Sequence, residues 1–419
     1  MGMKWMQRLL WPTVSGGTPE PGLYHYREER DGRVRRYHLR IDADGAGVLT
    51  VDARGLCRLS PVGVMMAQGL LGGEAPASLG ARVARAFRGR SVDAIHDDLR
   101  DLQATLKRLS LGRAGAVRDL DGIGASPFAR SLSAPLCADV EVGTLQAGRA
   151  VVDRLRAIGV PQVVWVLGDE PAPEHLPELV ERAEDQGLIC GLRTRASALP
   201  LALLERAIEA GLDHLDLLFL PEAELHAAWL GEGDREAAGR NLALAREAEI
   251  GAPAVVALRP GEDEPAAAIE ALRSFGFRQA AFHALLDPEG EAGRALPQLA
   301  VDLEEALTAA GFPGQWGPPH AVPAAAHPKA ARRGPRTVGE VTVRVLAGGE
   351  ILPPTGAPNP VGNLLGESWA RLWQAPAFTP WREASEAPER CPTCPGLEIC
   401  EGGCPAEAGS WASSGEVRS

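Results

Sequence analysis

The chain has 419 residues, of which 45% are hydrophobic and 23% are charged, and its formal net charge is −12. This composition is globular and excludes a small disulfide-stabilised scaffold, while the length favours two or three domains. No stretch approaches the roughly 20 apolar residues of a membrane-spanning helix, and the N-terminal residues lack the pattern of a cleaved signal peptide. We therefore expect a soluble, cytoplasmic protein without membrane contact.

The first predicted domain spans residues 21–110, after a Gly- and Pro-rich tail over residues 1–20. Residues 36–42 and 48–52 alternate around an Asp-Gly turn signal, which predicts a β-hairpin. Three helices should follow, and the third is the clearest because apolar residues recur at three-and-four spacing over residues 92–109. A hairpin followed by three helices is typical of a winged-helix domain.

This first domain is the basic part of an acidic chain. Residues 21–110 carry 15 Lys and Arg against 11 Asp and Glu. A basic surface can attract nucleic acid or an acidic partner. The arginines between residues 27 and 40 suit an ordinary solvated strand face equally well, so both interpretations stay open.

After a linker over residues 111–130, the block over residues 131–312 alternates strands and helices joined by short loops. This alternation predicts parallel strands with right-handed crossovers. We expect an α/β fold with a partial (β/α)6 TIM-like barrel, whose chemistry would lie at the carboxyl ends of the strands. His214 and Asp216 flank the fourth strand and are expected to be structural. The six predicted strands begin near Leu132, Val163, Leu188, His214, Ala254 and Gln279.

A Pro- and Ala-rich stretch over residues 313–336 is predicted to be a linker without regular structure, because proline removes a backbone donor and fixes φ. The small third block, residues 337–411, should contain a hairpin from Val338 and a helix over residues 366–373, before a tail over residues 412–419. Clustered cysteines in a cytosolic chain favour metal binding over disulfides. The four candidate ligands are Cys391, Cys394, Cys400 and Cys404.

The order of these blocks resembles the radical S-adenosylmethionine (SAM) enzymes that modify peptides. Those enzymes join a PqqD-like peptide-recognition domain, a partial barrel and a cysteine-rich SPASM or twitch extension. In the third block the resemblance rests on Gly349-Glu350-Ile351, on Val361-Gly362-Asn363-Leu364 and on the spacing of the four cysteines. In the barrel, Gly168-Asp169-Glu170-Pro171 is similar to the family's Gly-Gly-Glu-Pro turn. The resemblance covers most of the chain and implies a role in the biosynthesis of ribosomally made, modified peptides.

The barrel departs from this family at the residues that would bind its cofactors. Radical SAM enzymes hold their catalytic [4Fe–4S] cluster through Cys-x3-Cys-x2-Cys at the first strand, and no part of residues 1–390 has that spacing. If Cys137 marks the first ligand, the next two positions are Glu141 and Thr144, which are poor ligands for a soft metal. Asp169 replaces the second glycine of the SAM-binding turn. We therefore expect neither SAM binding nor its reductive cleavage.

The extension departs from the family as well. Cysteines that the family has before the Gly-Asn segment and after Cys404 are missing, so two auxiliary clusters lack ligands. Four thiolates suffice for one metal centre, which we expect to be a [4Fe–4S] cluster, with zinc as the alternative. Cys57 and Cys190 are expected to be buried small apolar residues.

We interpret the sequence as a non-catalytic radical SAM/SPASM-like protein that binds a precursor peptide, an active radical SAM maturase, or both. Two other classes stay open. One is an enzyme that uses Asp169, Glu170 and Glu141 at the barrel mouth as acids, although we expect Asp169 and Glu170 to cap a helix that begins at Pro171. The other is a winged-helix regulator that binds DNA. The acidic remainder of the chain disfavours this alternative.

Overall fold

The computed structural model describes residues 19–30, 33–52, 55–87, 92–110, 117–119, 134–286, 291–316, 320–321, 342–352 and 360–378. The chain divides into two compact units, Met1–Ser126 and Pro127–Ser419. No described helix has the length and apolar character needed to cross a membrane.

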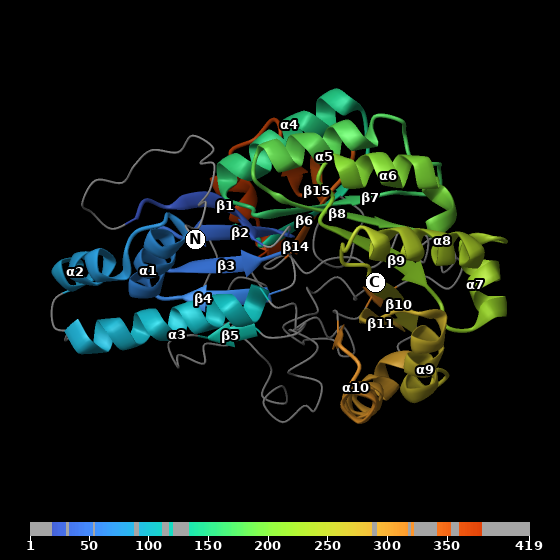
Figure 1. Ribbon diagram of the computed structural model, residues 1–419. Coiled ribbons are helices and arrows are strands. Elements are labelled where there is room, and N and C mark those ends of the chain that lie inside the picture. Colours follow the sequence, from blue (N-terminus) through green and yellow to red (C-terminus); the bar gives the residue numbers. More distant parts are fainter. Residues whose placement is uncertain are drawn as a thin grey trace. The chain divides into compact units, whose positions relative to one another are not determined.

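The first unit contains a sheet with the strand order β1 (Gly22–Arg30), β2 (Arg33–Ile41), β3 (Gly47–Val51), β4 (Gly55–Leu59) and β5 (Val117–Asp119) (Figure 1). The expected hairpin is confirmed by the antiparallel pairing of β2 with β3. Strand β1 was missed, because its second half, Arg-Glu-Glu-Arg, lacks the alternation of a half-buried strand. Strand β5 lies within the expected linker, where it pairs in parallel with β4.

The expected three helices follow β4 in the described part of this unit: α1 (Pro61–Leu71), α2 (Pro76–Ala86) and α3 (Val92–Ser110). Helix α1 begins after Ser60, whose Oγ accepts a hydrogen bond from the Gly63 N–H. Along α3 the predicted apolar face is buried at Ile95, Leu99 and Leu102, which join a core that includes the strands of the sheet. The hairpin and helix predictions for this unit are therefore confirmed.

The second unit is built on a sheet whose strands β6 to β12 run parallel in chain order. All six predicted barrel strands are present. The described strands do not close the sheet into a ring, so the barrel is partial, as expected. They are β6 (Cys137–Glu141), β7 (Gln162–Val166), β8 (Ile189–Thr194), β9 (His214–Phe219), β10 (Ala254–Leu258), β11 (Ala280–Leu286) and β12 (Gly314–Trp316).

Helices cover one face of this sheet and connect its strands: α4 (Leu145–Ile158), α5 (Leu176–Asp185), α6 (Leu201–Glu209), α7 (Ala223–Leu230), α8 (Asp234–Glu247), α9 (Pro265–Phe275) and α10 (Glu291–Ala310). Figure 1 shows α4, α5 and α6 along β6 to β8, and α9 and α10 outside β10 and β11. A Cβ at Gly148 of α4 would lie 2.6 Å from Leu179 Cδ2, so this glycine allows the close approach of α4 and α5.

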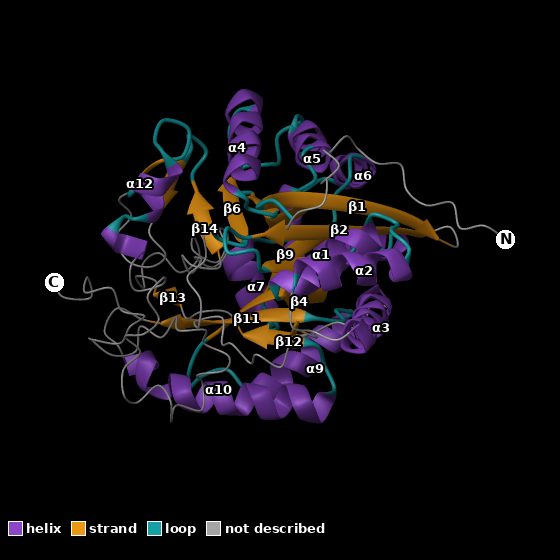
Figure 2. Ribbon diagram, turned by 90° about the vertical axis from the view of Figure 1, so that its left-hand side faces the viewer, coloured by secondary structure: helices purple, strands orange, loops and turns teal. Residues whose placement is uncertain are grey.

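The C-terminal part of the chain adds further strands to the same sheet, as Figure 2 shows for β14 beside β6. Strand β14 pairs in parallel with β6, and β15 and β16 continue the sheet in antiparallel order. The predicted linker over residues 313–336 also holds β12 and β13, which pair with β11. The prediction that this stretch lacks regular structure was wrong for residues 314–316 and 320–321, because the two short strands lie between the prolines and contain none. Residues 322–336 lie outside the described part of the chain. The added elements are β13 (His320–Ala321), β14 (Thr342–Val345), β15 (Glu350–Leu352), β16 (Gly362–Asn363) and helix α12 (Trp369–Trp373).

Candidate functional site

The two faces of the barrel sheet differ in chemistry. Side chains alternate between the faces along each strand, and those directed at the helices, such as Val140, Trp165 and Leu192, belong to the apolar core. The register of the strands places polar residues together on the opposite face, which we call the inner face. Its polar residues include Asp139, Glu141, Gln162, Arg193, His214, Asp216 and Arg344.

Arg193 of β8 is the centre of a polar network on the inner face. Its Nη1 donates to Asp139 Oδ2 on β6, and its Nη2 donates to Asp216 Oδ2 on β9 at 3.4 Å. The other oxygen of Asp216 lies 2.8 Å from His214 Nδ1, and His214 Nε2 lies 3.0 Å from Gln162 Nε2 on β7. The network therefore connects four neighbouring strands through their side chains.

Arg344 extends the network to β14. It is 7% exposed, stands opposite Asp139 in the strand register, and donates from Nη2 to Glu141 Oε1 at 3.0 Å. The carboxylate of Glu141, which we considered as an acid at the barrel mouth, is thus held by an arginine. This contact joins the first barrel strand to the C-terminal segment.

The network shifts the pKa values of the two buried carboxyl groups, Asp139 and Asp216, in opposite directions. Burial raises the pKa of Asp139, although Arg193 is bound to it. At Asp216 burial also acts to raise the pKa, but His214 and Arg193 outweigh it and hold the pKa below its usual value. Paired carboxyl groups with opposite shifts are frequent in acid–base sites. Here Arg193 binds both carboxylates, so the same cluster also fixes the strands.

Among the residues that the structure describes, the inner face does not offer the ligand set of a catalytic iron–sulfur cluster. Cys137 and Glu141 are the first and last residues of β6, and Thr144 is the N-cap of α4 beyond it. Only residues 142–144 connect β6 to α4, and none of them is a cysteine. A Cβ at Gly143 would lie 2.8 Å from the Cβ of Ala347, so this loop is packed against the turn that follows β14. The residues present therefore do not fit the cluster that radical SAM chemistry requires.

The Asp169-Glu170 pair lies in the loop after β7, with Glu170 exposed and Asp169 half-buried. The expected cap at Pro171 was wrong, because α5 begins at Leu176 and its N-cap is His175. Within the described residues, no three His, Cys, Asp or Glu side chains converge to hold a metal ion. Asp169, Glu170 and Glu141, the three residues considered as acids, are therefore not part of such a group.

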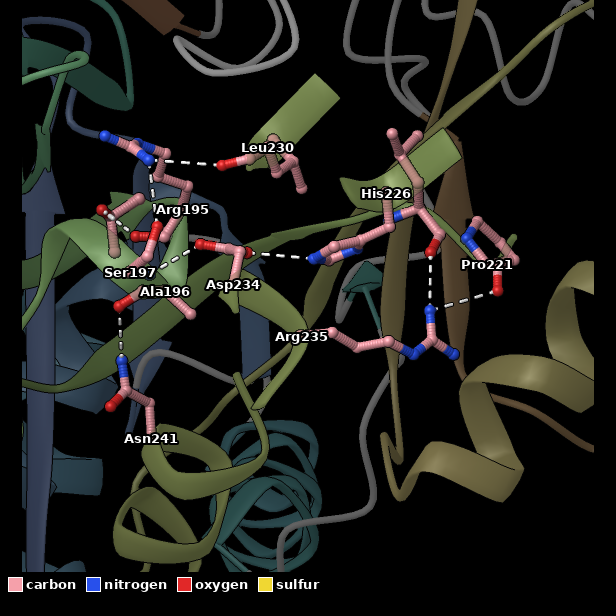
Figure 3. Close-up of polar contacts among 11 residues, drawn as sticks. Arg195, Ala196, Ser197, Pro221, His226, Leu230, Asp234, Arg235 and Asn241 are labelled. Carbon is pink, nitrogen blue, oxygen red and sulfur yellow. Dashed lines mark hydrogen bonds and ion pairs between the residues drawn. The ribbon is translucent and has the colours of Figure 1, made fainter. Parts of the chain in front are cut away.

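A second buried network, missed by the sequence analysis, lies beyond the carboxyl ends of β8 and β9 (Figure 3). His226 and Asp234 are 1% and 0% exposed, and His226 Nε2 lies 3.0 Å from Asp234 Oδ2. The other oxygen of Asp234 accepts from the Ser197 N–H at 2.6 Å, and His226 Nδ1 accepts from the Leu220 N–H at 3.2 Å. Every ring nitrogen and carboxylate oxygen of the pair has a partner, so the pair holds two loops together.

Arg195 connects this network to the loop after β7. It donates from Nη2 to the Asp169 carbonyl oxygen at 2.6 Å and from Nη1 to the Leu230 carbonyl oxygen at 3.2 Å, as the Arg195–Leu230 contact in Figure 3 shows. No periodic pattern marks such contacts, because each partner lies in a different loop.

The four predicted metal ligands, Cys391, Cys394, Cys400 and Cys404, lie outside the described residues. The Gly-Asn segment that precedes them is described. Asn363 Oδ1 accepts from the Leu365 N–H at 2.8 Å, and its Nδ2 donates to the Gly348 carbonyl oxygen at 3.0 Å. Arg154 of α4 donates to the Leu364 and Glu367 carbonyl oxygens. These contacts hold the start of the C-terminal block to the barrel.

Comparison with known proteins agrees with this fold. No family model matches the sequence. A PqqA peptide cyclase of Granulibacter bethesdensis is 27% identical over 280 residues, which cover 62% of this chain and 73% of the cyclase. The structure of Streptococcus suis SuiB bound to precursor peptide SuiA matches with a TM-score of 0.53 and 13% identity over 90% of this chain and 98% of SuiB. SuiB bound to S-adenosylmethionine matches with a TM-score of 0.51 and 13% identity over 88% and 94% of the two chains. The chain shares the fold of SuiB, and its sequence similarity to the cyclase supports the radical SAM resemblance.

Proposed function

We propose that this chain acts in the cytoplasmic maturation of a ribosomally made peptide without cleaving SAM. It binds a precursor peptide, an active radical SAM maturase, or both. The similarity to a peptide cyclase and the fold shared with a precursor-binding protein over nine-tenths of the chain support the peptide as partner. The observation that carries the non-catalytic part is the short loop between β6 and α4, which has no cysteine and is packed against the turn after β14.

The first test measures SAM cleavage directly. The chain is reconstituted with iron and sulfide under anaerobic conditions, reduced, and incubated with SAM, and 5′-deoxyadenosine is measured. We expect no product above that of a heat-inactivated sample, because no thiolate set is available at β6 to deliver an electron to SAM. Product formed above the control, and lost on mutation of Cys391 or Cys394, would show that the chain is an active enzyme.

The C-terminal cysteines are proposed to hold one metal centre, a [4Fe–4S] cluster or zinc. Two residues between Cys391 and Cys394 let one turn present both sulfurs, and thiolate binding energy becomes folding energy for the surrounding segment. Anaerobic purification with metal analysis should find one centre per chain. Replacement of Cys394 or Cys400 by Ser should abolish it, while the matched control Cys137→Ser should retain it because Cys137 lies on β6. A sample with neither iron nor zinc would contradict the centre.

The first unit is proposed to be the PqqD-like peptide-recognition domain. An extended peptide can add to the edge of a sheet and gain main-chain hydrogen bonds. A fragment spanning residues 1–126 should then bind candidate precursor peptides as tightly as the full chain does, because this range includes β5 and forms one compact unit. A fragment that ignores these peptides but binds duplex DNA with a steep dependence on salt would support the regulator instead.

A further inference from the structure

The imidazole of His214 lies across strand β8, although His214 belongs to β9. Its Nε2 reaches Gln162 of β7, and its Nδ1 contacts Asp216. A Cβ at Gly191 of β8 would lie 2.2 Å from His214 Cε1, so the ring fills the space that any other side chain at position 191 would need. The backbone of Gly191 is outside the left-handed region, and the three atoms nearest to an alanine Cβ there all belong to the His214 ring.

Charged groups surround this ring on several sides. Asp216 and Asp213 belong to its own strand and the residue before it, and Arg193 approaches from β8. Farther out on β6, Asp139 is bound to Arg193, and the Cys137 thiol lies near the same groups. The ring therefore lies among carboxylates and one guanidinium.

We propose that Gly191, His214, Asp216 and Gln162 form a proton-dependent lock on the barrel, in which protonated His214 ties β7 to β9 across β8. The ion pair with Asp216 supplies the electrostatic part of the lock. Gln162 serves both protonation states, because its Oε1 can accept from the imidazolium and its Nε2 can donate to the neutral ring. The inference rests on the described contacts and is independent of the proposed function.

The sign of the pH dependence follows from the surroundings of the ring. Burial acts to lower the pKa of His214, but the Asp216 carboxylate outweighs it and raises the pKa above its usual value. A histidine with a raised pKa in the folded state stabilises the fold fully below about pH 6.5, the value of the unfolded chain. That stabilisation is lost as the pH rises through the folded pKa. The barrel should therefore be held more firmly in mildly acidic than in alkaline solution.

A double-mutant cycle in the full chain tests the geometry. Gly191→Ala should lower the melting temperature by about 5 °C or more at pH 6, because the new Cβ displaces the ring. In the His214→Ala background the same change should have little effect, since the space is then empty. Gly239→Ala on α8 is the matched control, because its Cβ would meet nothing closer than Phe275 Cζ at 3.8 Å. If Gly191→Ala lowers the melting temperature equally in the natural chain and in the His214→Ala background, the proposed lock is wrong.

The proton dependence has its own test, which also covers the case in which Gly191→Ala fails to fold. The difference in melting temperature between the natural chain and His214→Gln should be larger at pH 6 than at pH 9. In the natural chain, the NMR titration of the His214 ring should have its midpoint above pH 6.5. A midpoint at or below that value, or a difference that does not change with pH, would refute the proton-dependent part of the proposal.

Discussion

The two faces of the barrel sheet are stabilised by different kinds of interaction, although they share the same strands. The helix-facing side chains, such as Trp165 at 0% exposure, are apolar and stabilise by burial and close packing. The inner face is crossed by ion pairs and hydrogen bonds that depend on charge and on a few specific partners. The outer packing thus specifies the fold, whereas the inner network fixes how neighbouring strands are held once the fold exists.

The free energy of unfolding should be more sensitive to the loss of side-chain volume on the helix-facing side than on the inner face. Trp165→Ala removes the largest fully buried side chain of β7 and leaves a cavity between the sheet and α4. We expect a loss of about 3–5 kcal/mol in the free energy of unfolding, measured by urea denaturation at neutral pH. A loss under about 1 kcal/mol would mean that this face is not the principal core.

The inner face should be sensitive to the loss of one charge. Arg193→Met leaves the carboxylates of Asp139 and Asp216 buried without their common partner, and we expect a cost of about 3 kcal/mol. The control is Arg182→Met, which removes a half-exposed ion pair with Asp153 and should cost under about 1 kcal/mol. If neutralising both carboxylates together with Arg193 fails to recover stability, the network is not an electrostatic unit.

Low pH should destabilise the fold through protonation of Asp216 on the inner face. Because the pKa of Asp216 is lowered in the folded state, its contribution is present above about pH 4 and is lost as the pH falls through the folded pKa. Asp216→Asn should remove this part of the acid dependence, with a cost of about 2 kcal/mol at neutral pH, the size of a hydrogen bond to a charged group. Asp139→Asn should not mimic it, because burial raises the pKa of Asp139. If stability falls with decreasing pH in Asp216→Asn as it does in the natural chain, this assignment is contradicted.

The smallest effect is expected at Thr144, which distinguishes a helix cap from a metal ligand. Its Oγ1 accepts from the Ala147 N–H at 3.3 Å at the start of α4. Thr144→Ala should cost about 1 kcal/mol of stability and leave the metal content of the chain unchanged, while Thr144→Ser should behave as the natural chain does. Loss of metal in Thr144→Ala would show that this loop takes part in metal binding.

Much of the fold could be predicted from the sequence, because periodic patterns report burial. The six barrel strands and the apolar face of α3 were located by such patterns. Strand β1 and the short β12 were not, since a charged strand and a strand of three residues lack the expected alternation.

The candidate site was harder to predict than the fold. The sequence indicated that a cysteine set is missing near β6, and it singled out His214 and Asp216 as structural. It could not show that Arg193 joins Asp139 to Asp216, or that Arg344 reaches Glu141. Such contacts depend on strand register and on the order of strands in the sheet, which no local pattern of residues encodes.

The pairing of β14 with β6 has a consequence for how the protein is made. These strands are joined by side-chain contacts between residues about 200 positions apart in the chain, as between Arg344 and Glu141. During synthesis the ribosome releases the whole barrel sequence before β14 emerges, so one edge of β6 stays unpaired for much of translation. Contacts of such long sequence separation form slowly, and exposed strand edges favour aggregation. A truncated nascent chain that ends before Thr342 should therefore depend on chaperones more than the complete chain does.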